Sequence, residues 1–199
     1  MESVVYFLLV LTSLVSLTFI IERGLALRWR KVVPPAVHTA VEVCADRSAV
    51  PALQQVCRQH ASPLGRLLLL AAEHLDRPKE ENESVLQTSA RREVVRLERG
   101  LVVLEIAVGV APLLGLVGTI VGMMTLFADI GQAGLSDAAR LARGIALILN
   151  ATLIGLLIAI PSLIAWSYFS KKVETLTVEM ETVCEKFLRR QYREGKKAS

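Results

Sequence analysis

The sequence predicts an all-α membrane protein with three transmembrane helices, the second and third of which extend into a cytoplasmic helical bundle. Of the 199 residues, 53% are hydrophobic, and the mean hydropathy of +0.48 is higher than that of most soluble domains of this length. Three uncharged runs occupy residues 3–21, 106–128 and 144–170. Each run is long enough to cross a hydrocarbon core of about 30 Å as a helix.

The first run lies within residues 1–27, which we predict as the first transmembrane helix. It lacks the basic leader and the small-residue cleavage pattern of a secretory signal, so we expect a retained span, with a signal sequence as the alternative. Residues 25–29 should carry the helix to the membrane interface, where Trp is favoured. Pro34 and Pro35 then stop it.

Residues 28–104 are predicted to form a cytoplasmic helical loop domain. Three short helices are expected first, at about 35–46, 48–60 and 64–75. Ser62 and Pro63 are favourable residues for the start of the last of these, as N-cap and first helical residue.

The second transmembrane helix is predicted at residues 105–128. Between Pro78 and Pro112 the chain has no proline, so one continuous helix is expected from about 81 to 128. An apolar stripe at helical spacing supports it: Val94, Leu97, Leu101 and Leu104.

Residues 129–143 are predicted as a periplasmic loop, 144–170 as the third transmembrane helix, and 171–199 as a cytoplasmic C-terminal helix and tail. Beyond the third span the helix should continue, because apolar residues repeat there at the spacing of a helical bundle. These residues are Val173, Leu176, Met180, Val183 and Phe187.

The distribution of basic residues predicts the orientation in the membrane. Residues 22–100 hold 13 of the 23 Lys and Arg residues, and residues 171–199 hold eight. Because Lys and Arg are enriched on the cytoplasmic side, the N-terminus should be periplasmic and the C-terminus cytoplasmic. The basic balance then reflects topology and contact with anionic membrane lipids, and it predicts no nucleic-acid partner.

Metal, cofactor and enzymatic sites are not expected. Cys44, Cys57 and Cys184 have no metal-ligand spacing and should be buried thiols. The three histidines show no ligand pattern either. At membrane depth the sequence has no Ser/His arrangement, HExxH motif or paired Asp, so we predict that the protein is not an enzyme.

Small residues form stripes on the second and third spans. In lipid such stripes let helices approach closely, because packing drives helix association there. They are Ala111, Gly115 and Thr119, with Gly118 and Gly122 on the adjoining row, and Ala151, Gly155 and Ala159 on the third span. Pro112 and Pro161 each free a backbone carbonyl, which a wet or protein-lined cavity would satisfy.

Three polar residues of these two spans are singled out: Thr119, Asn150 and Thr152. A Thr in a membrane helix commonly bonds a carbonyl of its own preceding turn, and this interpretation stays open beside a cavity-facing one. The Asn150 amide is costly against lipid, so it should face other helices or a cavity. Neither run contains Asp, Glu, Lys, Arg or His. A machine that moves charge would therefore take such a residue from a partner.

Two segments resemble the MotA/TolQ/ExbB proton-channel family. They are APLLGLVGT at residues 111–119 and AT-x-IGL-x-x-AIP at residues 151–161. Three spans, rather than four, are similar to the TolQ/ExbB branch of that family and not to the flagellar stator branch.

The resemblance implies a homopentamer in the bacterial inner membrane, with a central pore that conducts protons and needs no cofactor. The pore would hold a single-span ExbD/TolR-like partner whose membrane Asp carries the proton. Thr119 and Thr152 match the family's pore-facing threonines, and Asn150 would add polarity nearby. A TonB- or TolA-like protein is a further implied partner.

The chain departs from the family pattern at Leu147, where ExbB-like sequences often have a Glu directly after GIA, in a GIAEAL pattern. A proton path cannot use that carboxylate. The first functional hypothesis is a proton-driven motor subunit that energises transport across the outer membrane, with Tol-Pal-type envelope maintenance as its variant. The second is a non-conducting oligomeric membrane scaffold, which Leu147 favours.

Overall fold

The computed structural model describes residues 2–133 and 138–195, and every regular element within these ranges is helical. The elements are α1 (Glu2–Ala26), α2 (Trp29–Val32), α3 (Pro35–Val43), the 3-10 turn η1 (Arg47–Ala49), α4 (Val50–Gln59), α5 (Pro63–Glu73), α6 (Lys79–Glu98), α7 (Leu101–Ala133) and α8 (Ala138–Gly195). Parts of α1, α7 and α8 are long and apolar enough to cross a membrane. The predicted all-α class with three apolar helices of spanning length is confirmed.

The chain forms two compact units. The first contains the residues up to Arg23 together with Gly100–Tyr168, and the second contains Gly24–Arg99 together with the residues from Phe169 onward. The first unit therefore holds most of α1, all of α7 and the first part of α8.

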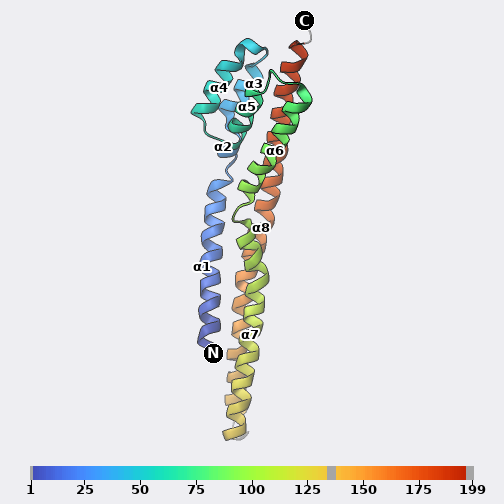
Figure 1. The fold of residues 1–199 in the computed structure, drawn as a ribbon. Coiled ribbons are helices and arrows are strands. Elements are labelled where there is room, and N and C mark those ends of the chain that lie inside the picture. The colour runs from blue at the N-terminus through green and yellow to red at the C-terminus, as the bar shows by residue number, and fades with distance from the viewer. Residues whose placement is uncertain (1, 134–137, 196–199) are drawn as a thin grey trace. The chain divides into compact units, whose positions relative to one another are not determined.

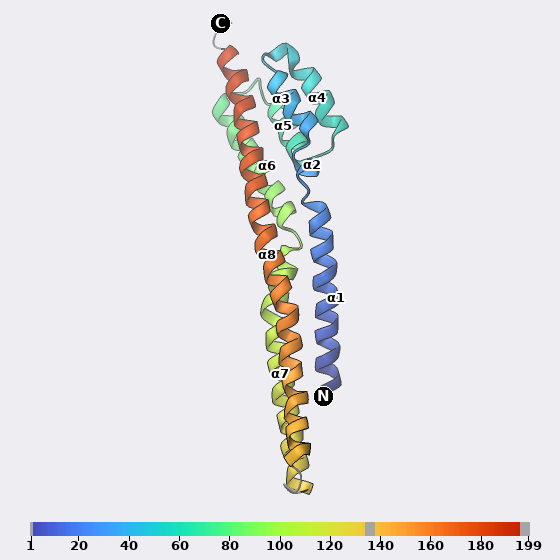
Figure 2. The same cartoon turned by 180° about the vertical axis from the view of Figure 1, so that it is seen from behind.

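In the first unit α7 and α8 lie side by side with opposite chain directions (Figure 1, Figure 2). On α1, Ser16 is hydrogen-bonded to Ser162 of α8 (Oγ–Oγ 2.5 Å). Large apolar side chains point away from the unit and are more than half exposed, among them Leu113, Ile120 and Leu153. Such an apolar exterior suits a lipid environment.

The predicted single helix from about 81 to 128 is wrong, because the chain breaks between α6 and α7. Gly100 has a φ of +92° at the break, a conformation that glycine adopts without strain. A Cβ at Gly100 would lie 3.1 Å from Phe19 Cδ1 and 3.1 Å from Arg23 Nε, so α1 leaves little room for a side chain. An isolated glycine in a helical pattern does not reveal such a break, since helices tolerate glycine.

Helical structure enters the predicted periplasmic loop at residues 129–143 from both sides. Helix α7 ends at Ala133 and α8 begins at Ala138. Residues 134–137 lie outside the described part of the chain. At its other end α8 continues without interruption from the third apolar run to Gly195.

The second unit buries the apolar stripe that was predicted beyond the third span. All five residues of that stripe are at most 3% exposed. Helices α3, α4, α5 and α6 contact one another in chain order, and they contribute further buried side chains: Val37, Val41, Leu53, Leu64, Leu68 and Leu86. The bundle-spacing interpretation of the stripe is confirmed.

The short helices of the second unit begin close to the predicted positions but end earlier. The first ends at Val43 instead of 46, and the second is divided into η1 and α4. The division arises because the Asp46 carboxylate accepts a hydrogen bond from the Ala49 amide (3.2 Å), which stabilises a separate tight turn. Ser62 caps α5 as predicted, since its Oγ accepts a hydrogen bond from the Gly65 amide (3.0 Å).

A buried polar cluster joins the start of α6 to the end of α8. Asn82 Nδ2 donates to the carbonyl of Ala71 (3.0 Å) and to the hydroxyl of Tyr192 (3.1 Å). The same hydroxyl lies 2.9 Å from the carbonyl of Arg77. The cluster therefore satisfies backbone groups of the α5–α6 connection that helix ends leave unpaired.

A buried carboxylate links α5 to α6. The Glu93 side chain is 7% exposed and accepts hydrogen bonds from Arg66 Nε (3.0 Å) and Arg96 Nη1 (2.8 Å). Burial alone would raise the pKa of Glu93, but the hydrogen bonds and charges of the two arginines outweigh burial and hold the pKa below its ordinary value.

Replacing Glu93 with glutamine is expected to lower the free energy of unfolding by about 1 kcal/mol at neutral pH, since Arg66 is half-exposed and partly screened. Because the folded pKa is depressed, the contribution of Glu93 is present above its ordinary pKa of 4.5 and is lost as pH falls through the folded pKa. The difference in the free energy of unfolding between the wild type and Glu93→Gln should therefore shrink as the pH falls from neutral to acidic. A matched Glu98→Gln change, at an exposed position of α6, should have no such effect; a difference for Glu93→Gln that stays constant with pH would contradict the assignment.

The three cysteines are buried and form no disulfide, which confirms the prediction of buried thiols. Burial raises the pKa of the Cys57 thiol to about 11 and that of the Cys184 thiol to about 12. Both thiols therefore stay protonated at physiological pH, and the thiolate is the reactive form.

Maleimide is expected to leave the folded protein unlabelled near neutral pH and to label all three cysteines after denaturation. Mass spectrometry of intact protein measures this directly. Rapid single labelling of folded protein would show that one of the thiols is accessible.

Candidate functional site

The contact between α7 and α8 is built from glycine and alanine. A Cβ added to Gly155 would lie 2.5 Å from the carbonyl oxygen of Ala111, and one added to Gly115 would lie 2.8 Å from the carbonyl oxygen of Ala151. These distances are shorter than a carbon–oxygen contact allows, so the two backbones touch where side chains are absent. Close backbone approach of this kind increases van der Waals contact, which drives helix association in lipid.

The same contact continues along both helices in the direction of the 129–143 connection. A Cβ at Gly118 would lie 2.7 Å from Ala151 Cβ, and one at Gly122 would lie 2.7 Å from Ile148 Cγ1. Ala111, Gly115 and Gly118 of α7 therefore lie against Ala151 and Gly155 of α8, and Gly122 lies against Ile148.

Thr152 lies at this contact and is half-buried. Its hydroxyl donates a hydrogen bond to the carbonyl oxygen of Gly115 on the neighbouring helix (3.2 Å). The bond crosses from α8 to α7, unlike the within-helix bond that a membrane Thr commonly makes. A Cβ at position 115 would lie 2.9 Å from the Cα of Thr152.

Thr119 is half-buried on α7, and its hydroxyl donates to the carbonyl oxygen of Leu116 in its own helix (2.7 Å). Thr119 lies one helical turn, about 6 Å along the axis, from Gly115. Because Thr152 binds Gly115, the two threonine hydroxyls lie at similar depths along the α7–α8 pair.

Asn150 is exposed on α8. Within the described part of the chain, the Asn150 amide has no hydrogen-bond partner. The Thr152 hydroxyl, two residues further along α8, does have one. An exposed amide at membrane depth needs a polar partner, because lipid offers none. The side chain of Leu147, one turn earlier, lies outside the described side chains.

Pro112 and Pro161 both lie inside continuous helices. Pro112 is half-buried, whereas Pro161 is exposed and lines a surface groove between α1 and α8. Neither proline ends its helix, in agreement with the tolerance of membrane helices for proline.

The arrangement can donate and accept hydrogen bonds but cannot take up a proton near neutral pH. The sequence between Glu105 and Asp129, and between Arg143 and Lys171, contains hydroxyl and amide groups and no ionisable group that titrates in this range. A change of protonation at this depth therefore requires a titratable group from outside these two spans.

A family model described as the MotA/TolQ/ExbB proton channel family matches residues 59–182, which include α6, α7 and most of α8. The chain belongs to the MotA/TolQ/ExbB family. Membership confirms the resemblance predicted from the motifs of the second and third spans. It also confirms that this multi-pass membrane protein belongs to a class of channel subunits and is not an enzyme.

Relatives in this family bear the names ExbB and TolQ. The biopolymer transport protein ExbB of Helicobacter pylori is 40% identical over 81 residues, 41% of this chain and 56% of that protein. The putative biopolymer transport protein ExbB-like 1 of Synechocystis is 33% identical over 171 residues, 82% of this chain and 65% of that protein. The Tol-Pal system protein TolQ of Pseudomonas aeruginosa is 31% identical over 135 residues, 68% of this chain and 58% of that protein. The chain thus spans between about half and two thirds of the length of these MotA/TolQ/ExbB relatives.

Sequence reasoning missed two features of the membrane unit. It did not identify the Gly115 carbonyl as the acceptor for Thr152, and it did not pair Ser16 with Ser162. Serines in apolar spans are a signal for helix–helix hydrogen bonds, but the sequence does not say which serines meet.

Proposed function

We propose that this protein is the pore-forming subunit of an ExbB/TolQ-like inner-membrane motor driven by the proton-motive force. It would energise transport across the outer membrane together with a single-span ExbD/TolR-like partner. The observation that carries the proposal has two parts. Two threonine hydroxyls lie at similar depth, and the spans that contain them have no carboxylate. A proton path built this way is incomplete until a partner supplies the titrating group.

The proposed assembly is a homopentamer around that partner. Asn150 supports it, because an exposed amide at membrane depth gains partners when several copies surround a polar pore. Thr119 and Thr152 are proposed to line the proton path beside the partner's membrane Asp. The membrane-buried glycines would keep α7 and α8 together as one wall of the pore.

The proposed orientation has the N-terminus and the 129–143 connection in the periplasm and the C-terminus in the cytoplasm. The excess of Lys and Arg in residues 22–100 and 171–199 supports it. A TonB- or TolA-like protein would then connect the motor to the outer membrane.

The cost of holding a charged Asp within the membrane is comparable to the energy that one proton releases when it crosses. A charged Asp at the bilayer centre costs about 2.5–3.5 kcal/mol, and one proton that crosses about 100 mV releases about 2.3 kcal/mol. Hydroxyl and amide groups around the Asp need to offset a cost of only that size for its protonation to alternate.

Proton uptake by liposomes tests the proposal. The full chain is reconstituted with and without its genomically neighbouring single-span partner, and a potassium diffusion potential is imposed. Flux is expected with both proteins present and should disappear when the partner's membrane Asp is replaced by Asn. A stable complex with the partner that conducts no protons would favour the non-conducting scaffold, for which Leu147 in place of the family's frequent Glu is the supporting observation.

A Tol-Pal-type role is the second candidate, supported by the similarity to TolQ of Pseudomonas aeruginosa over 68% of this chain. Deletion of the gene separates the two roles. Loss of growth on a substrate imported through the outer membrane indicates the transport role, whereas sensitivity to detergents with normal import indicates envelope maintenance.

A further inference from the structure

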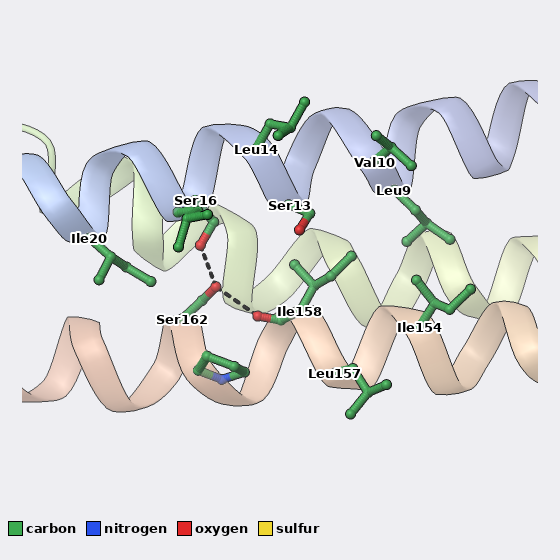
Figure 3. Close-up of a pocket in the computed structure, with 12 residues that line it drawn as sticks. Leu9, Val10, Ser13, Leu14, Ser16, Ile20, Ile154, Leu157, Ile158 and Ser162 are labelled. Carbon is green, nitrogen blue, oxygen red and sulfur yellow. Dashed lines mark hydrogen bonds between the residues drawn. The ribbon is translucent and has the colours of Figure 1, made fainter.

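A groove runs along the surface of the first unit between α1 and α8, and its cavity volume is about 380 Å³. Figure 3 shows Leu9, Ser13 and Ser16 pointing from α1 toward α8 at this groove. The lining on α1 is completed by Val10, Leu14, Leu17 and Ile20, and that on α8 by Ile154, Leu157, Ile158, Pro161 and Ser162. Every one of these residues lies within an uncharged, membrane-spanning run.

The groove has a buried floor and an exposed rim. Leu9, Ser16 and Ser162 are at most 3% exposed, whereas Leu14 and Leu157 are about 60% exposed. The groove therefore opens sideways from the helices, toward the space that lipid or another transmembrane helix occupies.

The floor presents carbon to an occupant. The hydroxyls of Ser16 and Ser162 are hydrogen-bonded to each other (2.5 Å), and the Ser162 hydroxyl also donates to the carbonyl of Ile158 (2.8 Å), as Figure 3 shows. Nine of the twelve lining residues are apolar. Such a surface selects an apolar occupant over water, since water requires two or more polar partners.

The length of the groove matches one leaflet of a bilayer. From Leu9 to Ile20 the α1 helix rises about 16 Å, roughly half of a hydrocarbon core about 30 Å thick. The groove ends two residues before Glu22, the first charged residue after the span. It therefore extends from one membrane face to about the middle of the bilayer.

The cavity volume of about 380 Å³ is of the size that one lipid chain fills. A methylene group is close in size to a water molecule, whose share of liquid volume is about 30 Å³, so the groove holds on the order of a dozen methylenes.

We propose that this groove binds one acyl chain of a phospholipid in the leaflet on the Glu22 side of the membrane. Dispersion contacts hold the chain in place, because the alternative environment, the bilayer itself, is also apolar. The bound chain fills the space between α1 and α8 on both sides of the Ser16–Ser162 bond.

Photolabelling of the full chain tests this site. The protein is placed in phosphatidylethanolamine–phosphatidylglycerol bilayers that contain a phosphatidylethanolamine with a diazirine along one acyl chain. After illumination, mass spectrometry is expected to find adducts on Ile154 and Ile158 several-fold more often than on Phe7 and Leu11, which are exposed on α1 but do not line the groove.

Replacing Ser13 with phenylalanine should fill the groove and reduce these adducts several-fold. The matched control is Thr18→Phe, at an exposed hydroxyl residue of α1 outside the groove, which should leave them unchanged. Equal labelling of groove and outer residues overturns the proposal. So does an unlabelled groove in the assembled oligomer, which would show that side chains of a second copy fill it.

Discussion

Replacing Gly155 with alanine is expected to weaken the α7–α8 contact and to lower the free energy of unfolding by about 1–3 kcal/mol, the usual cost of overpacking. The added methyl group would lie 2.5 Å from the carbonyl oxygen of Ala111 and 3.3 Å from the Cα of Gly115. Both neighbours are backbone atoms, so neither can rotate away, and the helices must separate. Titration of the full chain with denaturing detergent, followed by Trp fluorescence, measures the loss.

Gly109 provides the matched control on α7. A Cβ there would meet nothing within 4 Å, and alanine favours a helix over glycine by up to about 1 kcal/mol. Gly109→Ala should therefore be neutral or stabilising. Equal effects of the two substitutions would mean that glycine at position 155 does not serve the helix contact.

Replacing Thr152 or Thr119 with valine is expected to abolish proton flux while leaving the complex assembled. Valine keeps the shape of threonine and removes the hydroxyl that we propose to solvate the partner's Asp. The hydrogen bond from Thr152 to Gly115 is of a kind that contributes only about 0.6 kcal/mol on average in membrane proteins, so its loss should not prevent folding. Liposome flux measures the function, and native mass spectrometry measures the assembly.

Thr125 is the control for this pair. It is exposed on α7, and its hydroxyl donates to Val121 in its own helix (3.0 Å), as that of Thr119 does to Leu116. Thr125→Val should conduct normally. Normal flux in Thr119→Val and Thr152→Val would remove the threonines from the proton path, and loss of assembly in either would assign them to packing alone.

The sequence alone predicted the all-α class, the three apolar helices and the family, because each depends on local pattern. Uncharged runs of spanning length identify helices that can enter lipid. The stripe from Val173 to Phe187 gave the buried face of α8 beyond its apolar run, since a helix repeats every 3.6 residues. The motifs around Thr119 and Thr152 were sufficient to indicate the family.

The tertiary structure decided where helices break and which groups meet. The chain breaks between α6 and α7 at Gly100, which has a φ of +92° and lies against α1, with Phe19 Cδ1 3.1 Å from where a side chain would start. Thr152 bonds Gly115, and Ser16 bonds Ser162, across large separations in the chain. Local pattern fixes the face on which a residue lies, whereas the partner on that face depends on the registration of whole helices, which only their packing determines.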